Sequence, residues 1–244
     1  LNRARQSRRE WRNFVKQTRK HRHRCPNGLG LIGALRYFPA WRRALRGAQP
    51  VDDGVPWMTF PAIRFLERLL RLPMRVFEYG SGGSTLFFAQ RAASVHSIEH
   101  NPDWCRRVAA CLRRHDLNNA VLELREPTPA PEASETDPQE WGTYVSSAPE
   151  FNGYSFRQYV ESIDRYADGY FDVILIDGRA RPACIRHAMP KVRAGGYLIL
   201  DNSDLPHYQR AMHAVDARFR RQDFPGPIPY LAPFIMTTFW HRLD

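Results

Sequence analysis

Features that mark several protein classes are scarce or absent in this chain of 244 residues. It contains four cysteines but no Cys-x-x-Cys pair, which excludes the usual zinc motif and favours a reducing compartment. No segment approaches the ~20 apolar residues of a membrane-spanning helix. The apolar run nearest the N-terminal arginines, residues 28–35, is too short and too rich in glycine for an export signal. We therefore expect a soluble, cytoplasmic protein.

Positive charge is plentiful but confined to one end of the chain. The formal net charge is +11, and residues 1–24 hold ten lysines and arginines against one acid, Glu10. That segment carries +9, which leaves +2 for the other 220 residues. We expect a basic arm, solvated or partly helical, then a wrapping linker up to residue 56 and a main domain over residues 57–244. Contact with nucleic acid or an anionic membrane is expected only through residues 1–24.

Apolar runs alternate with amphipathic segments through most of the main domain. Thr59 is expected to cap a helix with Pro61 in its first turn. The alternation indicates a doubly wound, mostly parallel α/β sheet with helices on both faces. A final strand in an edge hairpin is expected at 235–240. The other predicted strands are 75–79, 94–99, 120–124, 171–176 and 197–200, and the other helices are 84–93, 102–115, 156–166 and 181–192.

One long segment, residues 127–150, interrupts this alternation. It contains five prolines and five acids and has no lysine or arginine. Loops of this length inside a compact domain are usually functional or disordered. Two interpretations stay open, a lid on the substrate side and a plain surface insertion.

The most informative stretch is residues 76–85, where an apolar run ends in Glu78 and breaks into a glycine-rich turn. Such a turn brings backbone N–H groups toward a nucleotide. A dinucleotide fingerprint requires a third small residue, but Thr85 stands at that position after Gly80 and Gly82. No lysine follows the glycines, so this is no phosphate-binding loop either. The turn therefore favours a nucleoside ligand without phosphates.

Acids end four of the predicted strands: Glu78, Glu99, Asp177 and Asp201. Ligands of open α/β sheets bind outside the carboxyl ends of the strands. A carboxylate such as Glu99, at the end of the strand after the glycine turn, is suited to bind ribose hydroxyls. Together the four acids suit a ligand that carries a ribose and cationic groups.

At these motifs the chain resembles the class I S-adenosylmethionine (SAM)-dependent methyltransferases. The resemblance covers about residues 57–240 and is strong at 78–84, 97–100, 171–178 and 195–202. It implies a seven-stranded sheet whose last strand is antiparallel, with SAM as the cofactor. It also implies that the glycine turn approaches the methionine moiety, with Glu78 beneath it and Glu99 on the ribose. The implied cofactor-binding residues are Glu78, Gly80, Ser81, Gly82, Ser84, Thr85, Glu99, His100 and Asp177.

A finer resemblance concerns metal-dependent O-methyltransferases of the catechol and caffeoyl-CoA type. It implies a divalent ion, such as Mg²⁺, held by Asp177, Asp201 and Asn202. These enzymes carry a lysine three residues after the first aspartate, where this chain has Ala180. The alternative, in which Asp177 acts alone and the other two residues cap a turn, stays open.

The candidate catalytic residues are Asp177, near the expected methyl group, and His207, a base that follows a strand end. His100 stays open as a base as well. Arg179 and Arg181 are expected either to attract an anionic acceptor or to form a solvated helix start.

The motifs and the charge distribution are compatible with several functions. The first is O-methylation of a small-molecule or glycan hydroxyl. The second is methylation of RNA or protein, with residues 1–24 gripping an acidic partner. A nicotinamide oxidoreductase and a non-catalytic cofactor-binding module are the others. The sequence indicates neither the acceptor nor the oligomeric state.

Overall fold

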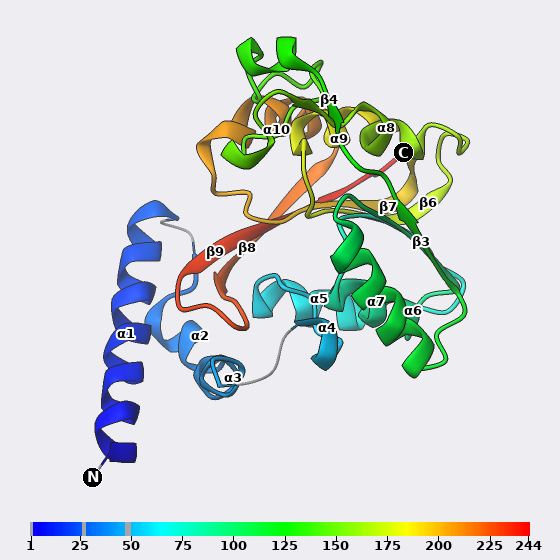
Figure 1. Ribbon diagram of the computed structural model, residues 1–244. Helices are drawn as coiled ribbons and strands as arrows, with labels where there is room; N and C mark the ends of the chain where they lie inside the picture. The colour runs from blue at the N-terminus through cyan, green and yellow to red at the C-terminus, as the bar shows by residue number, and fades with distance from the viewer. Residues whose placement is uncertain (1, 26–27, 47–49) are drawn as a thin grey trace.

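The structure is a computed structural model, and it describes residues 2–25, 28–46 and 50–244 (Figure 1). Its centre is a seven-stranded sheet in the order β3-β2-β1-β6-β7-β9-β8. All neighbouring pairs from β3 to β7 are parallel, and β9 is antiparallel to both of its neighbours. This confirms the predicted doubly wound, mostly parallel sheet with an antiparallel last strand. The strands are β1 Arg75–Tyr79, β2 Ser94–Glu99, β3 Ala120–Leu124, β6 Phe171–Ile176, β7 Val192–Leu200, β8 Arg220–Pro227 and β9 Phe234–His241.

Helices cover both faces of the sheet (Figure 1). On one face lie α8 Arg157–Val160, α9 Arg181–Ala188 and α10 Gln209–Asp216, and on the other α5 Phe60–Leu69, α6 Gly83–Ala89 and α7 Pro102–Arg114. Strand β6 is buried along its whole length because its side chains alternate between two cores. Ile174 and Ile176 belong to the core under α8, α9 and α10, and Val173 and Leu175 belong to the core under α5, α6 and α7.

Several predicted element ends are moved by local chemistry. Strands β1, β2, β3 and β6 have the predicted bounds, and Thr59 caps α5 by accepting a hydrogen bond from Ala62 N at 3.3 Å. The helix expected at 181–192 instead ends at Ala188, in a 3₁₀ turn at Met189–Lys191, because Pro190 cannot continue the helical hydrogen bonds. Strand β7 then starts at Val192, five residues before its predicted start.

Two other predicted helices are shorter than expected. The helix expected at 84–93 is α6, which ends at Ala89 because the chain must turn before β2 begins. The helix expected at 156–166 is α8 followed by the 3₁₀ turn Glu161–Ile163. There the Ser162 hydroxyl donates to the Tyr159 carbonyl at 2.6 Å and so competes with the helical backbone bonds.

The basic N-terminal segment is a helix, α1 Asn2–Arg24, packed on the body of the protein. Leu1 lies outside the described residues. The Phe14 ring makes edge contacts at 5.1 Å with Trp41 and with Phe234 of β9. Trp41 also donates from Nε1 to the Leu231 carbonyl at 3.1 Å. Three short helices follow α1: α2 Leu31–Leu35, α3 Phe38–Ala44 and α4 Pro50–Asp53.

The segment at 127–150 is tied to the body by short elements. Strand β4 Thr128–Pro129 pairs with β5 Tyr154–Ser155, and 3₁₀ turns lie at Pro131–Glu135 and Pro149–Phe151. A further 3₁₀ turn, Pro206–Tyr208, precedes α10.

Within the described ranges, none of the helices is both long enough and apolar enough to cross a lipid bilayer.

Candidate active site

A cavity of about 700 Å³ runs along the carboxyl ends of β2, β1, β6 and β7, which are neighbours in that order. Glu99 lies at one end of this row, Gly80 and Asp177 in the middle, and Asp201 beyond them. The loop between β8 and β9 forms the opposite wall. The expected edge of the sheet therefore holds the cavity, and its volume falls in the range of small-ligand pockets.

The glycine turn after β1 depends on Gly80 and on Thr85. Gly80 has φ +91°, and a Cβ there would lie 3.1 Å from Gly178 N, so a side chain would strain the backbone and crowd the end of β6. Gly82 donates from its backbone N to Thr85 Oγ1 at 3.0 Å, and Thr85 Oγ1 donates to Glu78 Oε2 at 2.7 Å. The threonine that departs from the dinucleotide fingerprint thus closes the turn onto the strand-end acid.

Glu78 is fully buried behind this turn and does not line the cavity. Burial raises the pKa of Glu78 to about 7, although hydrogen bonds from Ser84, Ser97 and Thr85 oppose the shift. Among the described residues, its Oε1 atom finds no hydrogen-bond partner. Glu78, Ser84 and Thr85 therefore support the turn from below.

Glu99 is 2% exposed, and its carboxylate faces several donors. Oε1 accepts hydrogen bonds from the backbone N of His100 at 2.8 Å and of Asn101 at 2.9 Å. Oε2 accepts from Ser81 N at 3.1 Å and from Ser81 Oγ at 2.8 Å. His100 Nδ1 lies 3.0 Å from Oε1, although it is not aligned as a hydrogen bond. Burial alone would raise the pKa of Glu99, but the contacts from His100, Asn101 and Ser81 outweigh it and lower the pKa.

This arrangement fits a ribose. Three backbone N–H groups hold the Glu99 carboxylate charged and fixed in direction. The Ser81 hydroxyl and the His100 ring, in contrast, belong to rotatable side chains that two ribose hydroxyls can replace. Of the predicted cofactor-binding residues, the cavity brings together Gly80, Ser81, Glu99, His100 and Asp177, whereas Glu78, Gly82, Ser84 and Thr85 are absent from its lining.

Arg181, at the start of α9, connects the carboxyl ends of β6 and β7. Its Nε donates to the Gly178 carbonyl at 2.9 Å, and Nη2 donates to both the carbonyl and Oδ1 of Asp177 at 3.0 Å. Nη1 donates to the Asp201 carbonyl at 2.5 Å and to Asn202 Oδ1 at 3.3 Å. All five N–H groups of the guanidinium thus have an acceptor, and the side chain is only 11% exposed.

The same contacts bear on the predicted metal ligands. The Asp177 and Asn202 side-chain oxygens already accept hydrogen bonds from Arg181, a buried cation. The Asp201 carboxyl points to a different partner, because its Oδ1 accepts from the Thr237 hydroxyl at 2.6 Å. In the part of the chain that the structure describes, no group of three or more His, Cys, Asp or Glu side chains could hold a metal ion, and the predicted set offers two carboxylates and an amide. The three residues as arranged do not fit a divalent ion.

The two aspartates of this group differ in their electrostatic surroundings. Burial raises the pKa of Asp177 to about 6 against the lowering effect of Arg181 and Arg179. Burial and the neighbouring Asp177 raise the pKa of Asp201 well above its ordinary value. Both carboxyls therefore hold a proton more readily than an ordinary aspartate, and Asp177 is the one whose carboxylate pairs directly with Arg181 at 3.0 Å.

His207 lies outside the cavity lining. Its ring packs edge-on against Tyr208 at 4.2 Å, and its Nε2 lies 3.4 Å from Ser147 Oγ of the 127–150 segment. Burial and the positive charge of Arg181 lower the pKa of His207. The structure thus places Asp177 in the cavity lining and His207 outside it, beside the 127–150 segment.

The apolar wall of the cavity was not among the predicted site residues. It consists of Trp57, which is 45% exposed, and of four residues in and beside the β8–β9 loop, Ile228, Leu231, Pro233 and Ile235. The sequence carries a signal for it, because Pro229 and Pro233 interrupt the apolar stretch between β8 and β9 and keep the loop out of strand pairing. Trp104, also missed, donates from Nε1 to the Ser81 carbonyl at 2.7 Å and so fixes the glycine turn from the α7 side.

The acidic segment packs against the loop that follows β6. Glu150 pairs with Arg179 at 3.3 Å, and a small hollow of about 40 Å³ separates Ser146 and Ser147 from Arg181 and Pro182. No residue of the segment lines the main cavity among those described. The segment therefore borders the residues that hold Asp177.

Comparison with known proteins gives structural matches only. No family model matches the chain, and no curated protein matches it in sequence. The O-methyltransferase TomG from Streptomyces achromogenes, involved in tomaymycin synthesis and solved with SAM, matches with a TM-score of 0.55 at 15% identity, over 84% of this chain and 90% of that one. A methyltransferase from Geobacter sulfurreducens matches with a TM-score of 0.50 at 13% identity, over 84% and 88%. An rRNA methylase from Streptococcus thermophilus also has a TM-score of 0.50, at 14% identity over 74% and 93%.

These three proteins share the architecture of this chain over most of its length, and they include both an O-methyltransferase and an rRNA methylase. Identities this low establish a common fold and leave the acceptor open. The glycine turn, the Glu99 carboxylate and the seven-stranded order agree with that fold. The chain has the fold of the class I SAM-dependent methyltransferases, as the sequence resemblance predicted.

Proposed function

We propose that this protein is a SAM-dependent methyltransferase that methylates a hydroxyl group of a small molecule or a glycan. The observation that carries the proposal is that two kinds of lining share one cavity. Gly80 and the carboxylates of Glu99 and Asp177 line it, and Trp57 with the apolar residues in and beside the β8–β9 loop completes its wall. Such a cavity holds a nucleoside cofactor and a small acceptor side by side.

The glycine turn and Glu99 would hold the cofactor, which supplies an electrophilic methyl group when bound. The Glu99 carboxylate would accept both ribose hydroxyls in place of the Ser81 hydroxyl and the His100 ring. The lack of a side chain at Gly80 leaves room for close backbone approach to the methionine moiety. Asp177, whose carboxylate lies in the middle of the cavity, adds a negative charge that attracts the cationic part of this ligand.

The acceptor would lie between Asp177 and the apolar wall. Trp57 offers an exposed aromatic face to a planar or sugar-like molecule, and the β8–β9 loop excludes water from one side. The Asp177 carboxylate would orient the acceptor hydroxyl and take its proton. In methyl transfer, in-line positioning supplies much of the acceleration, so one correctly placed carboxylate is sufficient. We assign this role to Asp177 rather than His207, because His207 does not line the cavity.

Metal assistance is not part of this proposal. The Arg181 guanidinium already occupies oxygens of Asp177 and Asn202, and all five of its N–H groups are satisfied. A divalent ion would have to displace a buried cation from a complete hydrogen-bond shell. Mg²⁺ therefore has no role in the proposed reaction, and methyl-transfer activity in excess chelator tests whether an ion is needed.

Other parts of the sequence prediction fit this proposal. Residues 57–244 would form the methyltransferase domain and residues 1–56 an appendage to it. The 127–150 segment would act as a cap, because it packs beside Arg179 and behind the loop after β6. A location in the cytoplasm would match the scattered cysteines.

The test is a methyl-transfer assay with SAM labelled in its methyl group. The purified protein would be offered phenols, sugars, RNA and peptides in parallel, and base treatment would separate esters from ethers. We expect label in a small-molecule or glycan hydroxyl. Label in RNA or protein would replace the proposed acceptor with the alternative one. Tight cofactor binding without transfer to any class would favour the non-catalytic binding module.

A further inference from the structure

The outward side of α1 is basic from Arg5 to Lys20. Its cations recur at helical spacing, so they occupy about a third of the helix circumference and extend over roughly 22 Å. All of them are exposed. We call this surface the basic face of α1; it consists of Arg5, Arg8, Arg9, Arg12, Lys16, Arg19 and Lys20.

The opposite side of α1 is already used. Phe14, Thr18 and His21 are 0%, 3% and 5% exposed where α1 packs on the body. The helix therefore has no free apolar stripe to offer a partner helix. A partner of α1 has to bind the basic face.

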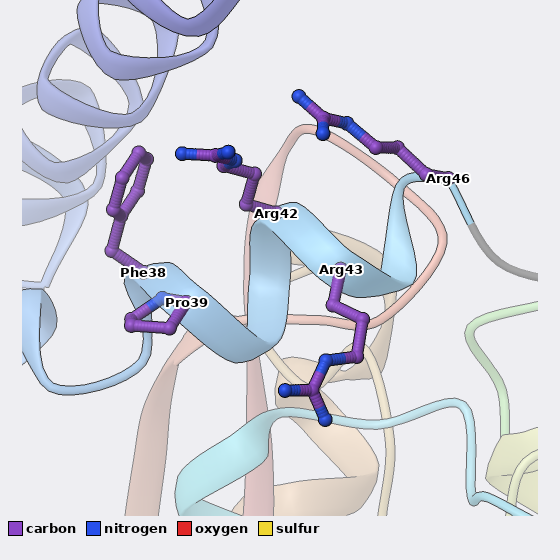
Figure 2. Close-up of a pocket in the computed structure, with 5 residues that line it drawn as sticks. All are labelled: Phe38, Pro39, Arg42, Arg43 and Arg46. Carbon is purple, nitrogen blue, oxygen red and sulfur yellow. The ribbon is translucent and has the colours of Figure 1, made fainter.

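The acid of this helix does not neutralise the basic face. Glu10 turns toward α3, where Arg46 forms a two-oxygen ion pair with it at 2.7 Å and Arg42 lies within 3.5 Å. Figure 2 shows Arg42 and Arg46 extending to the same side of α3, while Arg43 points to the other side. A hollow of about 540 Å³ between α1 and α3 is also lined by basic-face residues, Arg9, Arg12 and Lys16. Glu10 lines this hollow as well, but both of its carboxylate oxygens are paired with Arg46, so the three cations are left to attract an anion.

Exposed apolar side chains lie next to the basic helix. Trp11 on α1 is 42% exposed and contacts Phe38 edge-on at 5.1 Å. On α2, which contacts α1, Leu31 is 39% exposed and Ile32 87% exposed. Fully solvated isoleucine is unusual, and basic residues combined with Trp and Leu or Ile are typical of helices that lie on a membrane surface.

The charge distribution argues against a polyanion that runs from α1 into the cavity. The 127–150 segment, which borders the cavity residues, carries five acids and no lysine or arginine. Phosphates approaching from that side would be repelled. A flat anionic surface, in contrast, needs contact with the basic face alone.

We propose that α1 and α2 bind the protein to a membrane surface rich in anionic phospholipid. The basic face meets the headgroups, with the hollow beside α3 accepting one of them, and Trp11 and Ile32 contact the acyl boundary. Helices α1 and α3 also pack on the start of β9, through Phe14 with Phe234, and on the β8–β9 loop, through Trp41 with Leu231. Docking would therefore hold the acceptor side of the cavity one helix layer from the lipid surface.

The test is co-sedimentation of the full-length protein with vesicles of phosphatidylcholine alone or mixed with phosphatidylglycerol. We expect binding to the mixed vesicles only, and weaker binding as salt rises. The test variant changes Arg12, Lys16 and Arg19 to Gln. Because each cation near an anionic surface contributes about fivefold, the affinity should fall on the order of a hundredfold. The matched control has the same charge change on the exposed side of α7: Arg106, Arg113 and Arg114 to Gln.

Two further results separate this proposal from its alternatives. Ile32→Ser should weaken vesicle binding at high salt, where the apolar contact dominates, and leave RNA binding unchanged. S-Adenosylhomocysteine affinity should be the same in all variants, which shows that they are folded. Equal vesicle binding by the α1 and α7 triple variants would overturn the proposal. So would binding of RNA by the basic face without any binding to mixed vesicles.

Discussion

Replacing Arg181 by alanine should destabilise the sheet edge that carries the site. The guanidinium donates five hydrogen bonds to Asp177, Gly178, Asp201 and Asn202, and the side chain is 11% exposed. Alanine would leave these acceptors without their protein donor at the half-buried wall of the cavity. Removing one partner of a buried ion pair costs on the order of 3–5 kcal/mol. For a chain of this size that corresponds to a fall in Tm of roughly 6–20 °C.

The assay is urea unfolding followed by circular dichroism, with the neighbouring arginine as control. Arg179→Ala removes a more exposed side chain whose ion pair with Glu150 has a distance of 3.3 Å, so we expect a loss below about 1 kcal/mol. Arg181→Lys should fall between the two, because lysine supplies three donors without the planar fork. A free energy of unfolding for Arg181→Ala within about 1 kcal/mol of wild type would refute the reasoning.

The same variant gives a pH test with a defined sign. Burial raises the pKa of Asp177 to about 6 even with Arg181 present. When a carboxyl has a higher pKa in the folded than in the unfolded state, the free energy of unfolding falls as pH rises from the unfolded pKa to the folded pKa. Without Arg181 the folded pKa rises further, so the loss extends to higher pH. The gap in stability between variant and wild type should therefore widen as pH increases through and above about 6.

Three other results follow from the site geometry. Glu99→Ala should weaken S-adenosylhomocysteine binding by about 1.5–3 kcal/mol in calorimetry, whereas Glu123→Ala, in an ion cluster outside the cavity, should not; equal losses would remove Glu99 from its ribose role. The methyl-transfer rate should rise with pH around a midpoint of about 6 and lose that limb in Asp177→Asn; an unchanged profile in the variant would exclude Asp177 as the proton acceptor. Transfer should persist in excess chelator, and loss restored by Mg²⁺ would show that a metal displaces Arg181.

Much of the fold was predictable because its signals are local. Residues 173–176 of strand β6 are all apolar, as burial on both faces requires, and the predicted bounds of the strand were correct. The start of the helix predicted at 102–115 was correct, because Asn101 caps α7 by accepting a hydrogen bond from Trp104 N at 3.0 Å. The helix ends were less predictable, since Pro190 and Ser162 act through single hydrogen bonds inside otherwise helical stretches.

The site was predictable only where it follows from strand ends. Gly80, Glu99 and Asp177 were expected at one edge because parallel strands end together. The hydrogen bonds of Arg181 were missed. Its side chain is only 11% exposed, so it is not a solvated helix start, and it lines the cavity, where attraction of an acceptor stays a prediction. Its partners Asp201 and Asn202 directly follow strand β7, and their distance from Arg181 depends on the register between β6 and β7.

The packing of α1 was missed for a similar reason. Ten cations in residues 1–24 predict a solvated helix, and Phe14 is a weak signal against them. Its partners Trp41 and Phe234 lie far away in sequence. Packing of this kind depends on tertiary contacts that no local pattern encodes.

The most direct test of the central claim is calorimetry of the wild-type protein with SAM, S-adenosylhomocysteine and NAD. The Glu99 carboxylate and the glycine turn closed by Thr85 should bind both sulfur ligands at one site per chain. NAD should bind far more weakly, because the glycine turn lacks the third small residue that the dinucleotide fingerprint requires. Tight binding of NAD, or no binding of either sulfur ligand, would contradict the account.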